Sequence, residues 1–150
     1  MGSWIVLRPS VTLSTAQRLT AVNGKEYGGV ITKYADGNYG YNLFAGDKVT
    51  PGIPATVSFP TTGSIGMEFH SHTGNTPPSI TDLQVLSPGT QGYVITRDGA
   101  IYNYSTTVTP LGGGVSQYTY NVNVVQPSPS SQTAIYNYTP DIVNDSAGPP

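Results

Sequence analysis

The chain has 150 residues, a formal net charge of −2 and no cysteine, and only 9% of its residues are charged. This length allows one domain to bury a core without crosslinks, and the lack of cysteine excludes disulfides and thiolate metal ligands. Six Lys and Arg residues form no basic stripe for nucleic acid, and no apolar run approaches the ~20 residues that a membrane crossing needs. We therefore expect a polar, nearly neutral domain that binds neither nucleic acid nor membrane.

A helix and a hairpin are predicted first along the chain. After Pro9, the apolar residues of segment 10–19 recur at rough helical spacing, which predicts a short helix. Two β-rich segments, 26–34 and 39–43, flank the pair Asp36-Gly37. An Asp-Gly pair between such segments favours a tight turn, so we expect an antiparallel hairpin.

A strand, a second helix and a second hairpin follow. Residues 64–72 are typical of a buried strand, and residues 79–86 of a short helix. Segments 91–96 and 100–104 flank Arg97-Asp98-Gly99, which predicts another hairpin. This order of elements favours an α+β fold, and we expect a mixed β-sheet with two short flanking helices.

The last third of the chain differs in composition. Residues 111–114 predict a flexible joint, and alternating Tyr and Val residues over 118–124 predict an extra C-terminal β segment. A Pro/Ser-rich run begins at Pro127. We therefore expect a main domain over residues 1–125 and a partly ordered extension over residues 126–150.

Both histidines of the chain, His70 and His72, lie at the end of the predicted strand. Side chains at positions i and i+2 of a strand point to the same face, so the two imidazoles can reach one metal ion. Asp82 lies in the first turn of the helix that starts at Ser79, and a short loop turns this helix back toward the strand end. Two imidazoles and one carboxylate leave a fourth position of Zn²⁺ open to water, which is typical of a catalytic site.

This pattern resembles the JAMM (MPN/JAB) metalloproteases. The family motif combines His-x-His, a short loop and Ser-x-x-Asp with a glutamate on an earlier strand. The likeness is to the bacterial JAB-like branch, found in toxins and secreted proteins, and it covers roughly residues 20–105. The similar segments are Glu26 to Ile31, Gly66 to His72, Ser79 to Asp82 and Arg97 to Tyr102. The loop from Thr73 to Pro78 is one residue shorter than in the commonest form of the motif.

The resemblance implies a JAMM/cytidine-deaminase-like fold and a zinc-dependent peptidase or isopeptidase. It implies that His70, His72 and Asp82 bind zinc. Glu26 would be the general base for a zinc-activated water, and Ser79 would stabilise the oxyanion. The expected partner is a peptide or protein substrate in extended conformation. The resemblance also implies a secreted or effector setting, as part of a larger polypeptide or assembly.

Simpler interpretations stand beside these roles. His70 and His72 would be hydrogen-bonded strand residues in a metal-free protein, and Ser79 with Asp82 fits the capping box of a helix start. We favour the metal for Asp82, on the expectation that one carboxylate oxygen cannot serve both tasks fully. Glu68 is a second candidate base on the face that carries the histidines. The alternative function is a non-catalytic, zinc-stabilised binding or structural module of a secreted or phage-like assembly.

Overall fold

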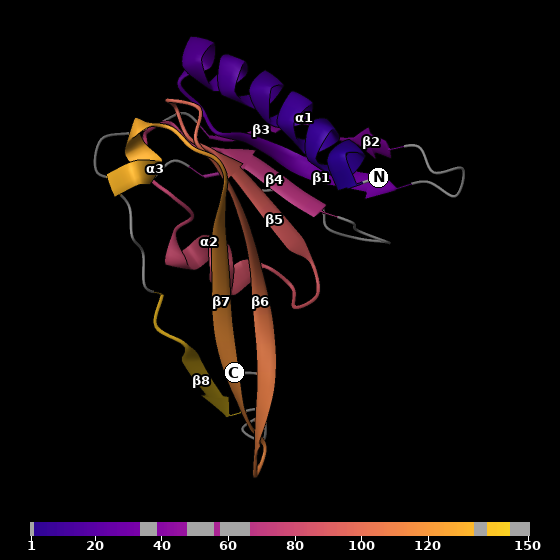
Figure 1. Cartoon of the computed structure of the whole chain (residues 1–150), viewed down its shortest axis with the longest axis vertical. Helices are drawn as coiled ribbons and strands as arrows, with labels where there is room; N and C mark the ends of the chain where they lie inside the picture. Colours follow the sequence, from indigo (N-terminus) through magenta and orange to yellow (C-terminus); the bar gives the residue numbers. More distant parts are fainter. Residues whose placement is uncertain (1, 34–38, 48–55, 58–66, 134–137, 145–150) are drawn as a thin grey trace.

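In the computed structural model of the chain, the described strands form one eight-stranded mixed β-sheet (Figure 1). The structure describes residues 2–33, 39–47, 56–57, 67–133 and 138–144. Its elements are α1 (Gly2–Asn23), β1 (Tyr27–Lys33), β2 (Tyr39–Tyr41), β3 (Phe44–Ala45), β4 (Met67–Ser71), α2 (Ile80–Val85), β5 (Gln91–Ile95), β6 (Ile101–Gly112), β7 (Val115–Gln126), α3 (Pro129–Thr133) and β8 (Asp141–Asn144). The strand order is β2-β1-β4-β5-β6-β7-β8, with β3 paired to β1. Among these pairings, β4 with β5 is parallel and the others are antiparallel.

Helix α1 covers one face of the sheet (Figure 1). Its residues Leu13 and Ala16 are fully buried against Phe69 of β4 and Ile95 of β5, in a cluster of apolar side chains. These strand residues share one face because strand side chains alternate between the two faces of a sheet. The same alternation sends the side chains of residues 68 and 70 to the opposite face.

Helix α2 packs on that opposite face. Leu83 of α2 is fully buried with Val94 of β5 and with Tyr102 and Tyr104 of β6 in a second apolar cluster. Neighbouring residues of β5 therefore belong to different clusters, since Ile95 packs with α1 and Val94 with α2. Both faces of the central strands are covered, which explains why β5 is buried at every residue after Gln91.

The predicted α+β class and the mixed sheet are confirmed, as are both hairpins. The first pairs Ile31 with Tyr41, while its turn, residues 34–38, lies outside the described residues. The second pairs Ile95 with Ile101. The helix expected over residues 79–86 is α2, and strand β4 covers residues 67–71 of the segment 64–72, of which residues 64–66 lie outside the described residues.

Three details of the prediction were wrong. The first helix is not short: α1 has 22 residues, begins at Gly2 and passes through Pro9, which the sequence pattern had placed before its start. A third helix, α3, lies in the C-terminal region, whereas only two helices were predicted. Residues 111–114, expected to be a flexible joint, form the end of the long β6–β7 hairpin, where Gly112, Gly113 and Gly114 all take positive φ values that favour glycine.

The C-terminal region contributes an edge strand. Strand β8 pairs antiparallel with β7 through four residue pairs, so β7 is not an edge strand of the described sheet. The carboxylate of Asp141 accepts hydrogen bonds from the Tyr120 hydroxyl of β7 and from the Gln84 amide of α2. Tyr138 donates a hydrogen bond of 2.6 Å to the carbonyl oxygen of Pro78. Among the described residues, no helix is both long and apolar enough to cross a membrane.

Removal of residues 134–150 is therefore expected to destabilise the protein. The four pairs between β7 and β8, at roughly 0.2–1 kcal/mol each, correspond to about 2 kcal/mol and to a decrease of roughly 4–8 °C in Tm. A chain that ends at Asn144 keeps β8 and serves as the control. Thermal unfolding of both truncated chains measures the effect, and equal Tm values would contradict the prediction.

Candidate metal centre

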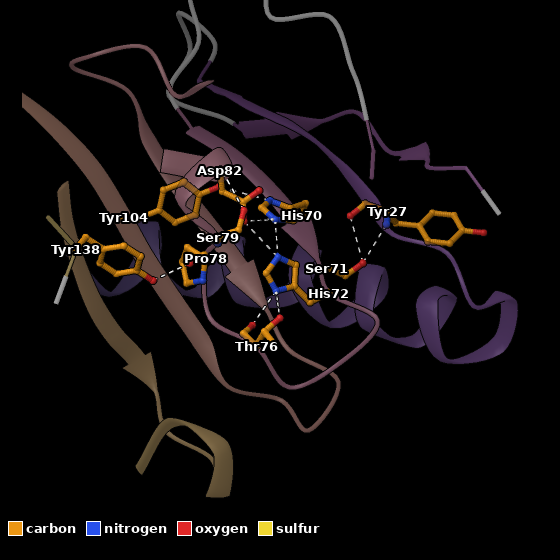
Figure 2. Close-up of polar contacts among 10 residues, drawn as sticks. All are labelled: Tyr27, His70, Ser71, His72, Thr76, Pro78, Ser79, Asp82, Tyr104 and Tyr138. Carbon is orange, nitrogen blue, oxygen red and sulfur yellow. Dashed lines mark hydrogen bonds and ion pairs between the residues drawn. The ribbon is translucent and has the colours of Figure 1, made fainter. Parts of the chain in front are cut away.

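Strand β4 places two imidazoles together on the face that α2 covers. His70 lies in β4 and His72 directly follows it, and each residue is 7% exposed. Their Nε2 atoms are 3.0 Å apart. Figure 2 shows the two rings next to each other. The intervening Ser71 points to the other face and is fully buried. The expected pairing of the two imidazoles on one face of a strand is thus present.

Helix α2 brings a carboxylate to the two imidazoles. Asp82 Oδ2 lies 3.4 Å from His70 Nε2 and 3.3 Å from His72 Nε2. The helix is held in place by the burial of Leu83, whose carbonyl oxygen accepts a hydrogen bond of 3.2 Å from Thr106 of β6. Asp82 directly precedes the buried Leu83, so it lies beside the face of the helix that packs on the sheet. From there its carboxylate reaches the imidazoles at the end of β4.

The three side chains fit a metal ion. Their ligand atoms all lie within 4.8 Å of one another. Bond lengths of about 2.0–2.2 Å to tetrahedral zinc place neighbouring ligand atoms roughly 3.3 Å apart, which agrees with the observed separations of 3.0, 3.4 and 3.3 Å. His72 Nδ1 donates to the carbonyl oxygen of Thr76 at 2.7 Å, which directs its Nε2 atom toward His70 and Asp82.

Ser79 and Asp82 also form a complete capping box. The Ser79 backbone N–H donates to Asp82 Oδ2 at 2.7 Å, and the Asp82 backbone N–H donates to Ser79 Oγ at 3.1 Å. Oδ2 is the same oxygen that faces both imidazoles. The same oxygen thus contacts the helix start and both imidazoles, because a carboxylate oxygen accepts more than one contact.

Glu26 enters the site through the pairing of β1 with β4. Gly28 pairs with His70, and continuing this antiparallel register by two residues brings Glu26 beside His72. Ser71 fixes the start of β1, because its hydroxyl accepts a hydrogen bond from the Tyr27 N–H at 3.0 Å and donates one to the Tyr27 carbonyl oxygen at 3.2 Å. Thr20 of α1 also bonds to the Ser71 hydroxyl. A residue between the two histidines thus aligns the neighbouring glutamate.

The carboxyl group of Glu26 is easier to protonate than an ordinary glutamate. The residue is 9% exposed, and burial raises its pKa to about 7. The nearby His72 acts in the opposite direction and the nearby Asp82 in the same direction. An acid with a pKa near neutrality can both accept and release a proton at physiological pH.

The charges of the other three groups depend on one another. Burial opposes a positive charge on both imidazoles. For His70, burial dominates and lowers the pKa. For His72, the contacts with Asp82 outweigh burial and raise the pKa. Burial acts against the charge of Asp82 as well, but hydrogen bonds from the imidazoles hold its pKa far below the ordinary value. Asp82 is therefore an anion throughout the physiological pH range.

A pocket of about 620 Å³ opens over His70, His72 and Asp82. Glu26, Glu68, Ser79 and Tyr104 also line it. Glu68 lies on the same face of β4, and burial raises its pKa. Glu26 interacts with the charges of His72 and Asp82, whereas burial is the sole cause of the shift at Glu68. Glu26 therefore interacts more strongly than Glu68 with the candidate metal ligands.

Two contacts of the site were not foreseen from the sequence. Thr76 holds His72, and Tyr104 of β6 lies against His70 with its hydroxyl 3.4 Å from Nδ1. Neither residue belongs to the His-x-His and Ser-x-x-Asp segments that pointed to the other residues of the site.

Comparisons with known proteins do not identify this chain: no protein-family model, curated protein or solved structure matches it.

Replacing Glu26 with glutamine is expected to stabilise the metal-free protein above neutral pH. A carboxyl group with a pKa of about 7 in the folded protein and 4.5 in the unfolded chain lowers stability progressively as pH rises between these values. At pH 8 the Glu26→Gln protein should be more stable by about 1–3 kcal/mol, and the difference should vanish near pH 4. Thermal unfolding in a chelator between pH 4 and 8 measures this. A difference that does not change with pH would contradict the assigned burial of Glu26.

Proposed function

We propose that the chain is a zinc-dependent hydrolase of amide bonds, a peptidase or isopeptidase of the JAMM type with the corresponding fold. One observation carries the proposal: the ligand atoms of His70, His72 and Asp82 converge in a pocket that also holds the buried Glu26. The resemblance of the His-x-His and Ser-x-x-Asp segments to that family supports it. The placement of α1 and α2 on opposite faces of a mixed sheet is compatible with the proposed fold.

Zinc is the metal that this donor set and its surroundings favour. Two imidazoles and one carboxylate form the ligand set of many hydrolytic zinc sites. The same donors also hold iron(II) in oxygenases, but an adjacent carboxyl group with a pKa of about 7 favours hydrolysis. Bound zinc lowers the pKa of a coordinated water to about 7 and polarises a carbonyl group.

Glu26 carries the proton in the proposed reaction. Its carboxylate accepts a proton from the attacking water, the water oxygen forms a bond to the carbonyl carbon, and the C–N bond breaks as Glu26 returns the proton to the leaving nitrogen. A pKa of about 7 suits both steps, because neither protonation state is strongly disfavoured. His70, His72 and Asp82 would hold the metal, and the burial of the two imidazoles would limit competing water.

Ser79 would stabilise the oxyanion in this reaction. Its side chain lines the pocket, and its Oγ atom accepts the Asp82 N–H. No acceptor for its own hydroxyl proton lies among the described residues, so this proton can be donated to a carbonyl oxygen that gains negative charge. The pocket lining of Thr, Glu and Val side chains suits a peptide or protein segment in extended conformation.

The capping box favours a second candidate function. The contacts of Ser79 and Asp82 stabilise the start of α2 without any reaction, and a metal held by the three ligands would add to the stability of the fold. A non-catalytic, zinc-stabilised binding or structural module is therefore the alternative. The buried Glu26 beside the ligands contributes nothing to such a module, which is why hydrolysis is preferred.

The Glu26→Gln protein separates these functions. We expect one zinc per chain, measured by elemental analysis after purification without added metal, in wild type and variant. Wild type should cleave members of a peptide and isopeptide library, detected by mass spectrometry, and the variant should cleave them at least ~10²-fold more slowly.

The same substitution at Glu68, the other glutamate of the pocket, should keep most of the activity. Zinc binding without cleavage by any of these proteins would favour the binding module. A chain that holds iron instead of zinc would exclude zinc-dependent hydrolysis, and a chain that binds no metal would exclude both functions.

Two further substitutions distinguish the metal from the helix cap. In Asp82→Asn an amide oxygen can still accept the Ser79 N–H, but the negative charge is lost, so we expect much weaker zinc affinity. The metal-free Tm should fall as well, because the charged carboxylate that contacts both imidazoles is gone. Ser79→Ala should lower the metal-free stability by about 1 kcal/mol and leave zinc affinity close to wild type. Chelator competition and thermal unfolding measure both quantities, and an Asp82→Asn protein that keeps wild-type zinc affinity would assign Asp82 to the cap alone.

A further inference from the structure

Tyr104 lies buried beside His70, although its strand is two strands away from β4 in the sheet. The residue is 2% exposed, and its hydroxyl oxygen is 3.4 Å from His70 Nδ1. Figure 2 shows the two side chains beside Asp82. The two rings meet edge to face, with centroids 6.4 Å apart and an interplanar angle of 76°. Among the described residues, the Tyr104 hydroxyl is the hydrogen-bond partner of His70 Nδ1.

Gly92 of β5 makes room for this ring. It pairs with Tyr104 on one side and with Glu68 of β4 on the other. A Cβ atom at position 92 would lie only 2.3 Å from Cε2 and Cζ of Tyr104. The tyrosine ring therefore lies over the backbone of Gly92 and crosses β5 to reach His70. Any larger residue at position 92 would displace the ring.

The two imidazoles of the centre are each held through Nδ1. His72 Nδ1 donates to the Thr76 carbonyl oxygen at 2.7 Å, which fixes both the ring and the position of its proton. His70 has the Tyr104 hydroxyl in the equivalent place. Histidine ligands in metal sites generally use their second nitrogen in this way, and the loss of such a partner typically costs 10–100-fold in metal affinity.

We propose that Tyr104 is a positioning residue of the metal centre, and that Gly92 is required because it leaves space for the Tyr104 ring. The hydroxyl accepts a hydrogen bond from His70 Nδ1–H, so the lone pair of Nε2 is directed toward His72 and Asp82. This role depends on the metal-binding part of the proposed function and not on its hydrolytic part.

Tyr104→Phe tests the role of the hydroxyl. This substitution keeps the ring and removes one oxygen atom, and we expect zinc affinity, measured by chelator competition, to fall about 10-fold or more. The Tm of the metal-free protein in a chelator should change little, which separates positioning from a loss of folding. The absorption spectrum of the Co²⁺-loaded protein should also change, because it reports the geometry of the ligands.

Tyr93→Phe is the matched control. It removes the same atom from another buried tyrosine, which packs in the apolar cluster on the α1 face of the sheet and does not line the pocket. Its zinc affinity and Co²⁺ spectrum should equal those of wild type. Equal losses of affinity in both variants, or an unchanged affinity in a folded Tyr104→Phe protein, would overturn the proposal.

Gly92→Ala provides a second and independent test. Alone, it should weaken zinc binding because the added methyl group displaces the tyrosine ring. Combined with Tyr104→Phe, it should cost much less additional affinity, since the hydroxyl that it displaces is already gone. Fully additive losses would overturn the link between the two residues.

Titration of the wild-type protein with zinc shows whether a negative result excludes the metal centre or only the hydrolytic function. A wild-type chain that binds no zinc would overturn this inference together with the metal centre. A chain that binds zinc, weakens on loss of the Tyr104 hydroxyl and cleaves no substrate would support the inference and remove only the hydrolytic function.

Discussion

The candidate site depends on the two-residue period of one short strand. This period places the imidazoles of His70 and His72 on the face of β4 that α2 covers and sends Ser71 to the other face. Ser71 then bonds to both backbone groups of Tyr27, which holds β1 in the register that brings Glu26 beside His72. Three consecutive residues thus supply two ligands and align the proposed base, and a shift of one residue in either strand would undo all three placements.

The polar groups of the site differ in how well their burial is compensated. His72 is bonded to Thr76, and the carboxylate of Asp82 accepts a backbone N–H as well as the imidazole contacts. Among the described residues, no hydrogen bond to the Glu26 carboxylate is found, and its raised pKa reflects burial beside another acid, which the nearby His72 offsets only in part. A stable fold gains nothing from this arrangement. Uncompensated groups of this kind are typical of functional sites, where stability and activity oppose each other.

Local patterns predicted those parts of the structure that depend on neighbouring residues. Turn pairs and alternation located the hairpins, and the spacing of Ser79 and Asp82 located the start of α2, because these signals act over a few residues. The contact of Tyr104 with His70 depends instead on strand order and on the empty space at Gly92. No pattern within the sequence of β6 reports which strands lie beside it. The same reason applies to β8, whose place at the edge of the sheet is set by pairing with β7 and not by its own four residues.

The position of Asp82 depends on distant parts of the chain, since α2 has only six residues and an isolated helix of this length is not stable. The sheet holds its inner side through Leu83 and Thr106. The C-terminal region holds its two ends, because Tyr138 bonds to Pro78 just before the helix and Asp141 bonds to Gln84 within it. Residues beyond β7 thus constrain the segment that supplies the third ligand. The C-terminal region is therefore coupled physically to the geometry of the metal centre, although none of its described residues lines the pocket.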